Sequence, residues 1–118
     1  MKLSASSKAG FTLVEIMIVV AIIGLLAAIA IPNFVKARQS SQRNACMANL
    51  KQMDGAKASW ALEQKKNNTD LPVDSDLFGS TAYIRDKPLC PANGTYTLNA
   101  VDTKVLCSKS SSPDLHSY

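Results

Sequence analysis

Glu15 is the residue whose position raises the first chemical question. It stands at the start of an apolar stretch, and from Ile16 to Ile31 no side chain is polar. A carboxylate costs about 3 kcal/mol at the centre of a membrane-spanning helix and less near its end. The residues alone leave two explanations open: a solvated carboxylate at the level of the lipid headgroups, or a carboxylate with a specific task.

The three cysteines are the second group with chemical potential. Cys46, Cys90 and Cys107 include no C-x-x-C pair, so the spacing indicates neither a zinc site nor a redox motif, and we expect no metal. An apolar, export-like segment favours a compartment in which thiols oxidise. We expect a Cys90–Cys107 disulfide, which closes a short loop and contributes about 3 kcal/mol on the loop-entropy model. The alternative is a Cys46–Cys107 disulfide, and in either case one thiol stays free.

Other candidate groups give weaker signals. His116 lies in a serine-rich tail, where we expect no fixed partner and no catalytic role. Asp70, Asp74 and Asp76 are close in sequence, and we read them as a solvated loop with a helix cap. The net charge of +4 is too scattered to indicate a nucleic-acid partner. We therefore expect no enzyme active site.

The apolar run that follows Glu15 can be read as a membrane-spanning helix or as a secretory signal. With Phe11 to Glu15 added, it has about the 20 residues that span a membrane as a helix. Lys2 and Lys8 precede it, and Ala28–Ala30 resembles a cleavage site, so an ordinary secretory signal that releases a small secreted binding module is the distant alternative. The run is longer than the roughly 7–15 residues typical of such a signal. A spanning helix is therefore favoured.

The helical pattern continues beyond Pro32. An apolar stripe recurs at steps of three and four, formed by Cys46, Leu50, Met53, Ala56 and Trp60. The residues mainly off this stripe are Lys51, Asp54, Lys57 and Glu63. We predict one helix from about Thr12 to about Lys65, bent near Pro32 because proline lacks a backbone donor. Trp60 is expected to anchor the core.

A small β structure is predicted to follow. Residues 71–93 read as a loop in which "DSDLFG" forms one short helical turn capped by Asp74 or Ser75. The stretch 94–100 then alternates with a period of two, and a strand at 104–108 follows a turn at Asp102–Thr103. In that register Val105 and Cys107 share an apolar face with Tyr96, Leu98 and Ala100.

These elements predict an α+β fold, with one long N-terminal helix packed by a small C-terminal antiparallel β head. The predicted segments are 1–10, a leader; 11–32, a hydrophobic transmembrane or filament-core helix; 33–66, an amphipathic helix half; and 67–118, a loop and β-hairpin head with a mobile tail.

The run Lys8-Ala9-Gly10-Phe11-Thr12-Leu13-Val14-Glu15, followed by the apolar stretch and Pro32, resembles the class III signal of type IV pilins and type II secretion pseudopilins. The resemblance implies that prepilin peptidase cuts between Gly10 and Phe11 and that Phe11 is then N-methylated. It implies that Glu15 pairs with the amino terminus of a neighbouring subunit's Phe11 during assembly. Gly24 and Pro32 match positions that flank a locally unwound stretch in some assembled pili.

This resemblance also implies a function. We expect a structural subunit of a pilus-like filament, a pseudopilin of a type II secretion-like system, with a type IV pilin for adhesion, motility or DNA uptake as the alternative. The expected partners are like subunits, the bacterial inner membrane and prepilin peptidase. Basic residues lie on both sides of the apolar run, so only the resemblance places the head outside the cytoplasm. No cofactor is expected, although major pseudopilins often bind calcium.

Overall fold

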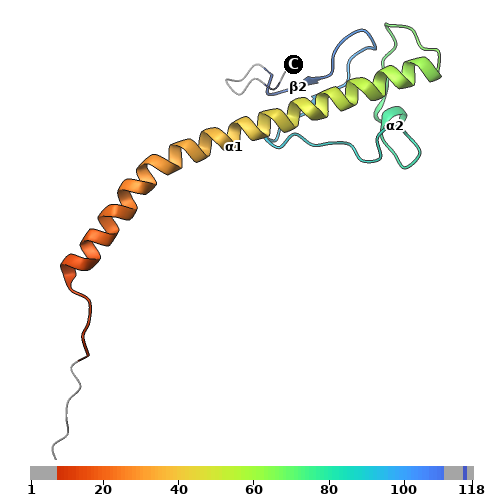
Figure 1. The fold of residues 1–118 in the computed structure, drawn as a ribbon. Coiled ribbons are helices and arrows are strands. Elements are labelled where there is room, and N and C mark those ends of the chain that lie inside the picture. The colour runs from red at the N-terminus through yellow and green to blue at the C-terminus, as the bar shows by residue number, and fades with distance from the viewer. Residues whose placement is uncertain (1–7, 111–115, 117–118) are drawn as a thin grey trace, which may run out of the picture. The chain divides into compact units, whose positions relative to one another are not determined.

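The computed structural model describes residues 8–110 and 116, which form two helices and two short strands. Helix α1 spans Leu13–Glu63 and helix α2 spans Asp74–Leu77, while strands β1 and β2 span Tyr96–Thr97 and Leu106–Cys107 (Figure 1). The predicted α+β architecture is confirmed, and the long helix begins and ends within two residues of the predicted bounds. The chain divides into an N-terminal unit, Met1–Lys36, and a C-terminal unit, Ala37–Tyr118.

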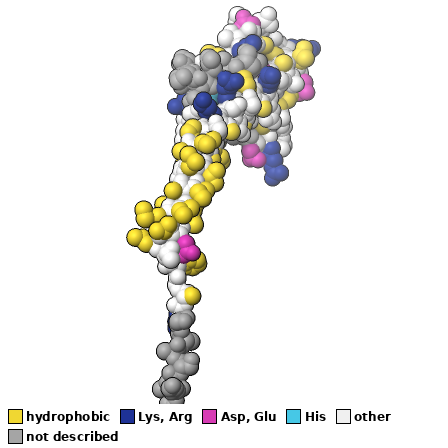
Figure 2. Space-filling view, turned by 60° about the vertical axis from the view of Figure 1, so that its left-hand side comes forward, with side chains coloured by type: hydrophobic (Ala, Val, Ile, Leu, Met, Phe, Trp, Pro, Cys, Tyr) yellow, Lys and Arg dark blue, Asp and Glu magenta, His cyan; other side chains and the backbone are white. Residues whose placement is uncertain are grey.

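The described part of the N-terminal unit presents its apolar side chains outward. From residue 8 to residue 36 every side chain is exposed except that of Ala27, which is half-buried. Hydrophobic side chains accordingly cover this helical segment (Figure 2). The helix is long and apolar enough to cross a membrane. Lipid or other protein must cover this surface, because apolar area of this extent is unfavourable in water.

Pro32 lies inside α1, and the helix continues past it to Glu63. Proline has no backbone N–H, so the carbonyl one turn earlier lacks its usual helical partner. The bend expected near Pro32 stays a prediction.

The core of the C-terminal unit is built on one face of α1. The predicted stripe is confirmed, since Cys46, Leu50, Met53, Ala56 and Trp60 are all buried. They pack with six buried side chains from the following segments: Leu77, Ile84, Cys90, Leu98, Val105 and Cys107. Trp60 is 6% exposed, which confirms its assignment to the core.

The two strands are shorter than predicted and pair in a different register. Tyr96 lies opposite Cys107 and Thr97 lies opposite Leu106 in an antiparallel pair. This register differs by two residues from one centred on Asp102–Thr103. Because side chains alternate with a period of two, the shift keeps Cys107 on the same face as Tyr96, as predicted.

The short helix α2 forms where predicted, but its predicted cap is wrong. The Asp76 carboxylate accepts a hydrogen bond from the backbone N–H of Val73 at 3.0 Å. Asp74 instead pairs through its carboxylate with the Lys87 ammonium at 2.6 Å. The helix starts at Asp74, so Asp74 is a residue of the first turn. The N-cap position belongs to Val73.

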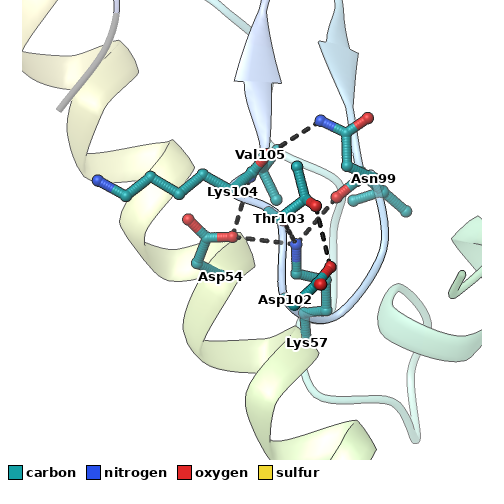
Figure 3. A network of polar contacts seen from close by, with 8 residues as sticks. Asp54, Lys57, Asn99, Asp102, Thr103, Lys104 and Val105 are labelled. Atoms are coloured by element: carbon teal, nitrogen blue, oxygen red, sulfur yellow. Dashed lines mark hydrogen bonds and ion pairs between the residues drawn. The ribbon is translucent and has the colours of Figure 1, made fainter. Parts of the chain in front are cut away.

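The prediction that Lys57 lies off the buried stripe is wrong. Its side chain is only 2% exposed. Its ammonium donates to the carbonyl of Leu98 at 3.0 Å and to the carbonyl of Thr103 (Figure 3). It also lies 3.3 Å from Asp54 Oδ1, which accepts the backbone N–H of Val105 at 3.0 Å. The charge is buried because the turn between the strands supplies acceptors in place of water.

Trp60→Ala tests the core. We expect the change to lower the free energy of unfolding of the fragment Ala37–Tyr118 by about 3–5 kcal/mol, because it removes a buried aromatic side chain and leaves a cavity. Urea denaturation followed by circular dichroism measures this change. An unaltered midpoint would contradict the placement of Trp60 in the core.

Lys57→Met tests the polar network. Methionine replaces the apolar stem of lysine but leaves Asp54 and two carbonyls without their cation, so we expect a loss of about 3–5 kcal/mol. Lys65→Met is the matched control at an exposed position in the turn that follows the helix, where surface changes stay within about 0.5 kcal/mol. Equal stability of the two variants in the same urea experiment would show that the network does not stabilise the fold.

Candidate functional site

The predicted cleavage site lies in a non-helical segment. Residues 8–12 have no regular secondary structure, and α1 begins at Leu13. Phe11 is 86% exposed. The Gly10–Phe11 bond therefore lies in exposed, non-helical chain. Cleavage there and methylation of Phe11 stay predictions.

Glu15 and Thr12 cap the first turn of α1 reciprocally. The Thr12 backbone N–H donates to Glu15 Oε2 at 2.7 Å, and the Glu15 backbone N–H donates to Thr12 Oγ1 at 3.2 Å. This is a capping box, in which two otherwise unpaired backbone donors find acceptors. No cap was predicted at this end of the helix, although the spacing T-x-x-E in residues 12–15 is the usual sequence signal for a capping box.

The cap does not exhaust the hydrogen-bonding capacity of Glu15. An ionised carboxylate has about four lone-pair positions on its two oxygens, and the cap uses one of them. The side chain is exposed. The N-terminal end of a helix also favours negative charge, so the carboxylate is held where a further cation can approach it.

Gly24 and Pro32 both lie inside the continuous helix α1. A Cβ added at Gly24 would meet nothing within 4 Å, so no contact within the described chain requires glycine there. Glycine and proline are nevertheless the residues that weaken a helix most, by about 1 and 3 kcal/mol. Local unwinding at these positions stays a prediction about the assembled state.

A second group of candidate side chains lies in the C-terminal unit. Four side chains offer ligand atoms that all lie within 4.8 Å of one another, and we call them the sulfur–imidazole cluster: Cys46, Cys90, Cys107 and His116. The Sγ atoms of Cys90 and Cys107 are 3.8 Å apart, and Cys90 Sγ is 3.5 Å from His116 Nδ1. All three cysteines are present as thiols, so the expected disulfide stays a prediction.

His116 corrects an expectation. It has fixed neighbours and is only 1% exposed, whereas the sequence indicated a residue without a partner. It is 26 residues from Cys90 in the chain, and Cys107 is 17 residues from Cys90. Such spacings match no short ligand motif, which is why sequence reading missed the cluster. The other residues of the predicted mobile tail, 111–115 and 117–118, lie outside the described residues.

The pKa values of the Cys46 and Cys90 thiols shift in opposite directions. Burial raises the pKa of the Cys46 thiol to about 12, and the Tyr96 hydroxyl that donates to its sulfur opposes this only in part. Burial also acts to raise the pKa of Cys90, but hydrogen bonds to its sulfur, led by those from the backbone of Ala92 and Gly94, lower it overall. The loop after Cys90 therefore favours a thiolate.

The aspartates considered as a calcium site are each engaged locally. Asp70 accepts the backbone N–H of Asn67 at 2.8 Å, and the contacts of Asp74 and Asp76 at α2 are those given above. Asp70 and Asp76 thus accept nearby backbone N–H groups, and Asp74 forms an ion pair. Calcium binding stays an untested expectation.

Comparison with known proteins places the chain in a family. Residues 5–31 match the family described as Prokaryotic N-terminal methylation motif. The chain is 30% identical to the competence protein ComGC of Bacillus subtilis, over 81% of this chain and 94% of that protein. It is 27% identical to type II secretion system core protein G of Klebsiella michiganensis, over 78% of this chain and 73% of that protein. The chain belongs to the family of type IV pilins and pseudopilins.

The matches to pilins are confined to a smaller part. The chain is 53% identical to the type IV major pilin protein PilA of Myxococcus xanthus, over 48% of this chain and only 26% of that protein. For a major fimbrial protein FimA of Dichelobacter nodosus the identity is 49%, over 52% of this chain and 38% of that protein. No solved structure was found to match the chain.

The capping box gives a prediction for the isolated subunit in detergent micelles. Glu15→Leu should destabilise the first turn of α1 by about 1 kcal/mol, because the N–H of Thr12 loses its acceptor. Glu15→Gln should retain the turn, since glutamine also serves at this position of a capping box. Amide hydrogen exchange at residues 12–16 measures the difference. Equal exchange in both variants would show that the side chain of Glu15 does not cap the helix.

Proposed function

We propose that this chain is a structural subunit of a pilus-like filament. One observation carries the proposal: the exposed apolar segment of α1 begins with a carboxylate held in a capping box, and nothing in the described residues covers that segment. A subunit of this kind is held in a membrane first and is then covered by copies of itself. The chain acts through association and not as an enzyme.

Processing creates the partner of Glu15. Prepilin peptidase cleaves the Gly10–Phe11 bond on the cytoplasmic side, which leaves an ammonium group on Phe11 that is then methylated. In the filament this cation pairs with Glu15 of a neighbouring subunit. The pair matters because a buried charge without a partner costs several kcal/mol, so only an arrangement that joins the two charges is favourable. Glu15 in this way selects the axial position of one helix against the next.

Within this class we favour a pseudopilin of a type II secretion-like system. The support is the length of the match: secretion core protein G aligns over 73% of its length, whereas the pilins PilA and FimA align over 26% and 38% of theirs. The C-terminal unit is small and has a single pair of short strands in its described part. A unit of this size agrees better with secretion core protein G than with the longer pilins. The subunit resides in the inner membrane with this unit outside the cytoplasm, and then in a periplasmic filament.

The second candidate is a filament for DNA uptake, because the match to the competence protein ComGC covers 94% of that protein. Adhesion and motility filaments remain in the same alternative class. Deletion of the gene in its own host separates these functions: loss of secreted enzymes indicates secretion, and loss of transformation, adhesion or surface motility indicates the alternative.

The assembly test uses three variants expressed as the sole subunit. Glu15→Gln removes the charge and keeps the cap, Glu15→Leu removes both, and Thr12→Val keeps the charge while removing one cap bond. We expect both Glu15 variants to lower the yield of sheared filaments at least about tenfold, the change that about 1.4 kcal/mol produces. The Thr12→Val variant should assemble.

Mass spectrometry of the N-terminus is the control, since each variant must begin at methylated Phe11 before its assembly is compared. Wild-type filament yield from Glu15→Gln would overturn the pairing role of the charge. An N-terminus at Ile31 would overturn the filament proposal and indicate a secreted module instead.

A further inference from the structure

The sulfur–imidazole cluster is assembled from segments far apart in the chain. Cys46 comes from α1 and Cys107 from β2, while Cys90 and His116 come from outside the helices and strands. The exposed fraction is 0% for Cys46, 6% for Cys90, 2% for Cys107 and 1% for His116. All four belong to the C-terminal unit. Their ligand atoms therefore meet in one closed, water-excluded place.

The spacing of these atoms agrees with a tetrahedral metal site. With Zn–S distances of about 2.3 Å and Zn–N distances of about 2.0–2.1 Å, tetrahedral geometry puts two sulfurs about 3.8 Å apart and a sulfur and a nitrogen about 3.5 Å apart. The observed separations are 3.8 Å between the sulfurs of Cys90 and Cys107 and 3.5 Å between Cys90 Sγ and His116 Nδ1. No two ligand atoms in the cluster are more than 4.8 Å apart. Shifts of about 1 Å, which side-chain rotation can supply, would therefore complete the tetrahedron.

The loop that follows Cys90 is shaped around the sulfurs. A Cβ added at Gly94 would lie 2.6 Å from Cys107 Sγ and 3.1 Å from Cys90 Sγ, so only glycine lets the backbone approach this closely. The backbone of Ala92 and of Gly94 hydrogen-bonds to Cys90 Sγ. Backbone donors to a ligating sulfur are the outer-shell contacts that orient metal ligands.

Cys46 is supported from the other side. The Tyr96 hydroxyl lies 3.5 Å from Cys46 Sγ, and the same oxygen accepts a hydrogen bond from Asn49 Nδ2 at 3.1 Å. Asn49 lies one turn of α1 beyond Cys46, so this chain of contacts fixes the direction of the sulfur. Two of the three sulfurs thus have an oriented outer shell.

We propose that the sulfur–imidazole cluster binds one Zn²⁺ ion as a closed, structural Cys3His site. Four protein ligands fill a tetrahedral shell and leave no open position for water or substrate, which is the mark of structural and not catalytic zinc. Thiolate and imidazole ligands in tetrahedral geometry are those that zinc prefers, whereas calcium requires six to eight oxygens.

Binding replaces protons by metal. Each thiol loses one proton to solvent and the imidazole binds in its neutral form, so three protons leave for each zinc bound and the complex carries one net negative charge. The backbone donors to Cys90 and the hydroxyl of Tyr96 face this charge. The ion joins the helix, β2 and the loop after Cys90, and its binding free energy adds to the stability of a small core.

Zinc and the expected Cys90–Cys107 disulfide exclude each other. A disulfide brings the two sulfurs to about 2.05 Å and removes two of the four ligands. It also leaves Cys46 as a lone buried thiol. Zinc instead uses all three sulfurs and accounts for the burial of His116 beside them.

The test uses the full chain in detergent, purified with a reductant and then dialysed against excess Zn²⁺. We expect one zinc per chain by elemental analysis, and the intense visible absorption of tetrahedral cobalt with thiolate charge-transfer bands when Co²⁺ replaces zinc. Iodoacetamide should modify none of the three thiols in the zinc form and all three after chelation. Chelation should also lower the melting temperature of the C-terminal unit.

Variants separate a metal ligand from a packing residue. His116→Leu fills the buried site with an apolar side chain that cannot bind metal and should lose stoichiometric zinc, whereas His116→Cys restores a fourth ligand and should retain it. Leu106→Ser is the control, because Leu106 is 46% exposed on the opposite face of β2 and should keep one zinc per chain. Because zinc binding is coupled to folding, the comparison of His116→Cys with His116→Leu carries the test: zinc retained by the first and lost by the second assigns the loss to the missing ligand.

Three results would overturn the proposal. The first is a wild-type chain that stays free of zinc under these conditions. The second is stoichiometric binding of copper but not zinc. The third is a Cys90–Cys107 disulfide, recovered by peptide mapping from chain that was offered zinc and oxidised together, because bound zinc should protect both thiols.

Discussion

The structure depends on one constraint: the apolar start of α1 cannot remain in water. From residue 8 to residue 36 the described chain covers almost none of its own apolar surface. The hydrophobic effect, at about 25 cal/mol for each Å² of apolar area, then makes a membrane or neighbouring helices the favourable surroundings. Glu15 is tolerated in this segment because it lies at its end and already has a backbone donor. The proposed filament follows from this arrangement.

The C-terminal unit solves the opposite problem, since it must remain folded with little to bury. Its core is one stripe of α1 and six side chains from later segments, and its strands are only two residues long. Backbone pairing of this extent is marginal without further support. The buried ammonium of Lys57 supplies part of that support by joining the turn between the strands to the helix. A zinc ion in the sulfur–imidazole cluster would supply more at the other end of the strands.

Local patterns in the sequence were sufficient for the helix and for its buried face. The steps of three and four that include Leu50, Met53 and Trp60 depend only on helical periodicity, and all three residues are buried. The contacts of Lys57 and His116 could not be read in this way, because their partners lie 41 and 26 residues away. The strand register failed for a related reason: the turn residues permit more than one alignment, and tertiary packing decides between them. The capping box, in contrast, is local, because Thr12 and Glu15 are three residues apart.

The capping box also bears on the entropy of association. A free glutamate explores many rotamers, and fixing them on binding opposes assembly by up to about 2 kcal/mol. The bond from the Thr12 N–H to Glu15 Oε2 has already restricted this side chain before any partner arrives. An incoming ammonium therefore meets an acceptor whose direction is set, and less conformational freedom is lost at the moment of contact. Pre-organisation of this kind raises the selectivity for correctly placed neighbours without adding a single new interaction.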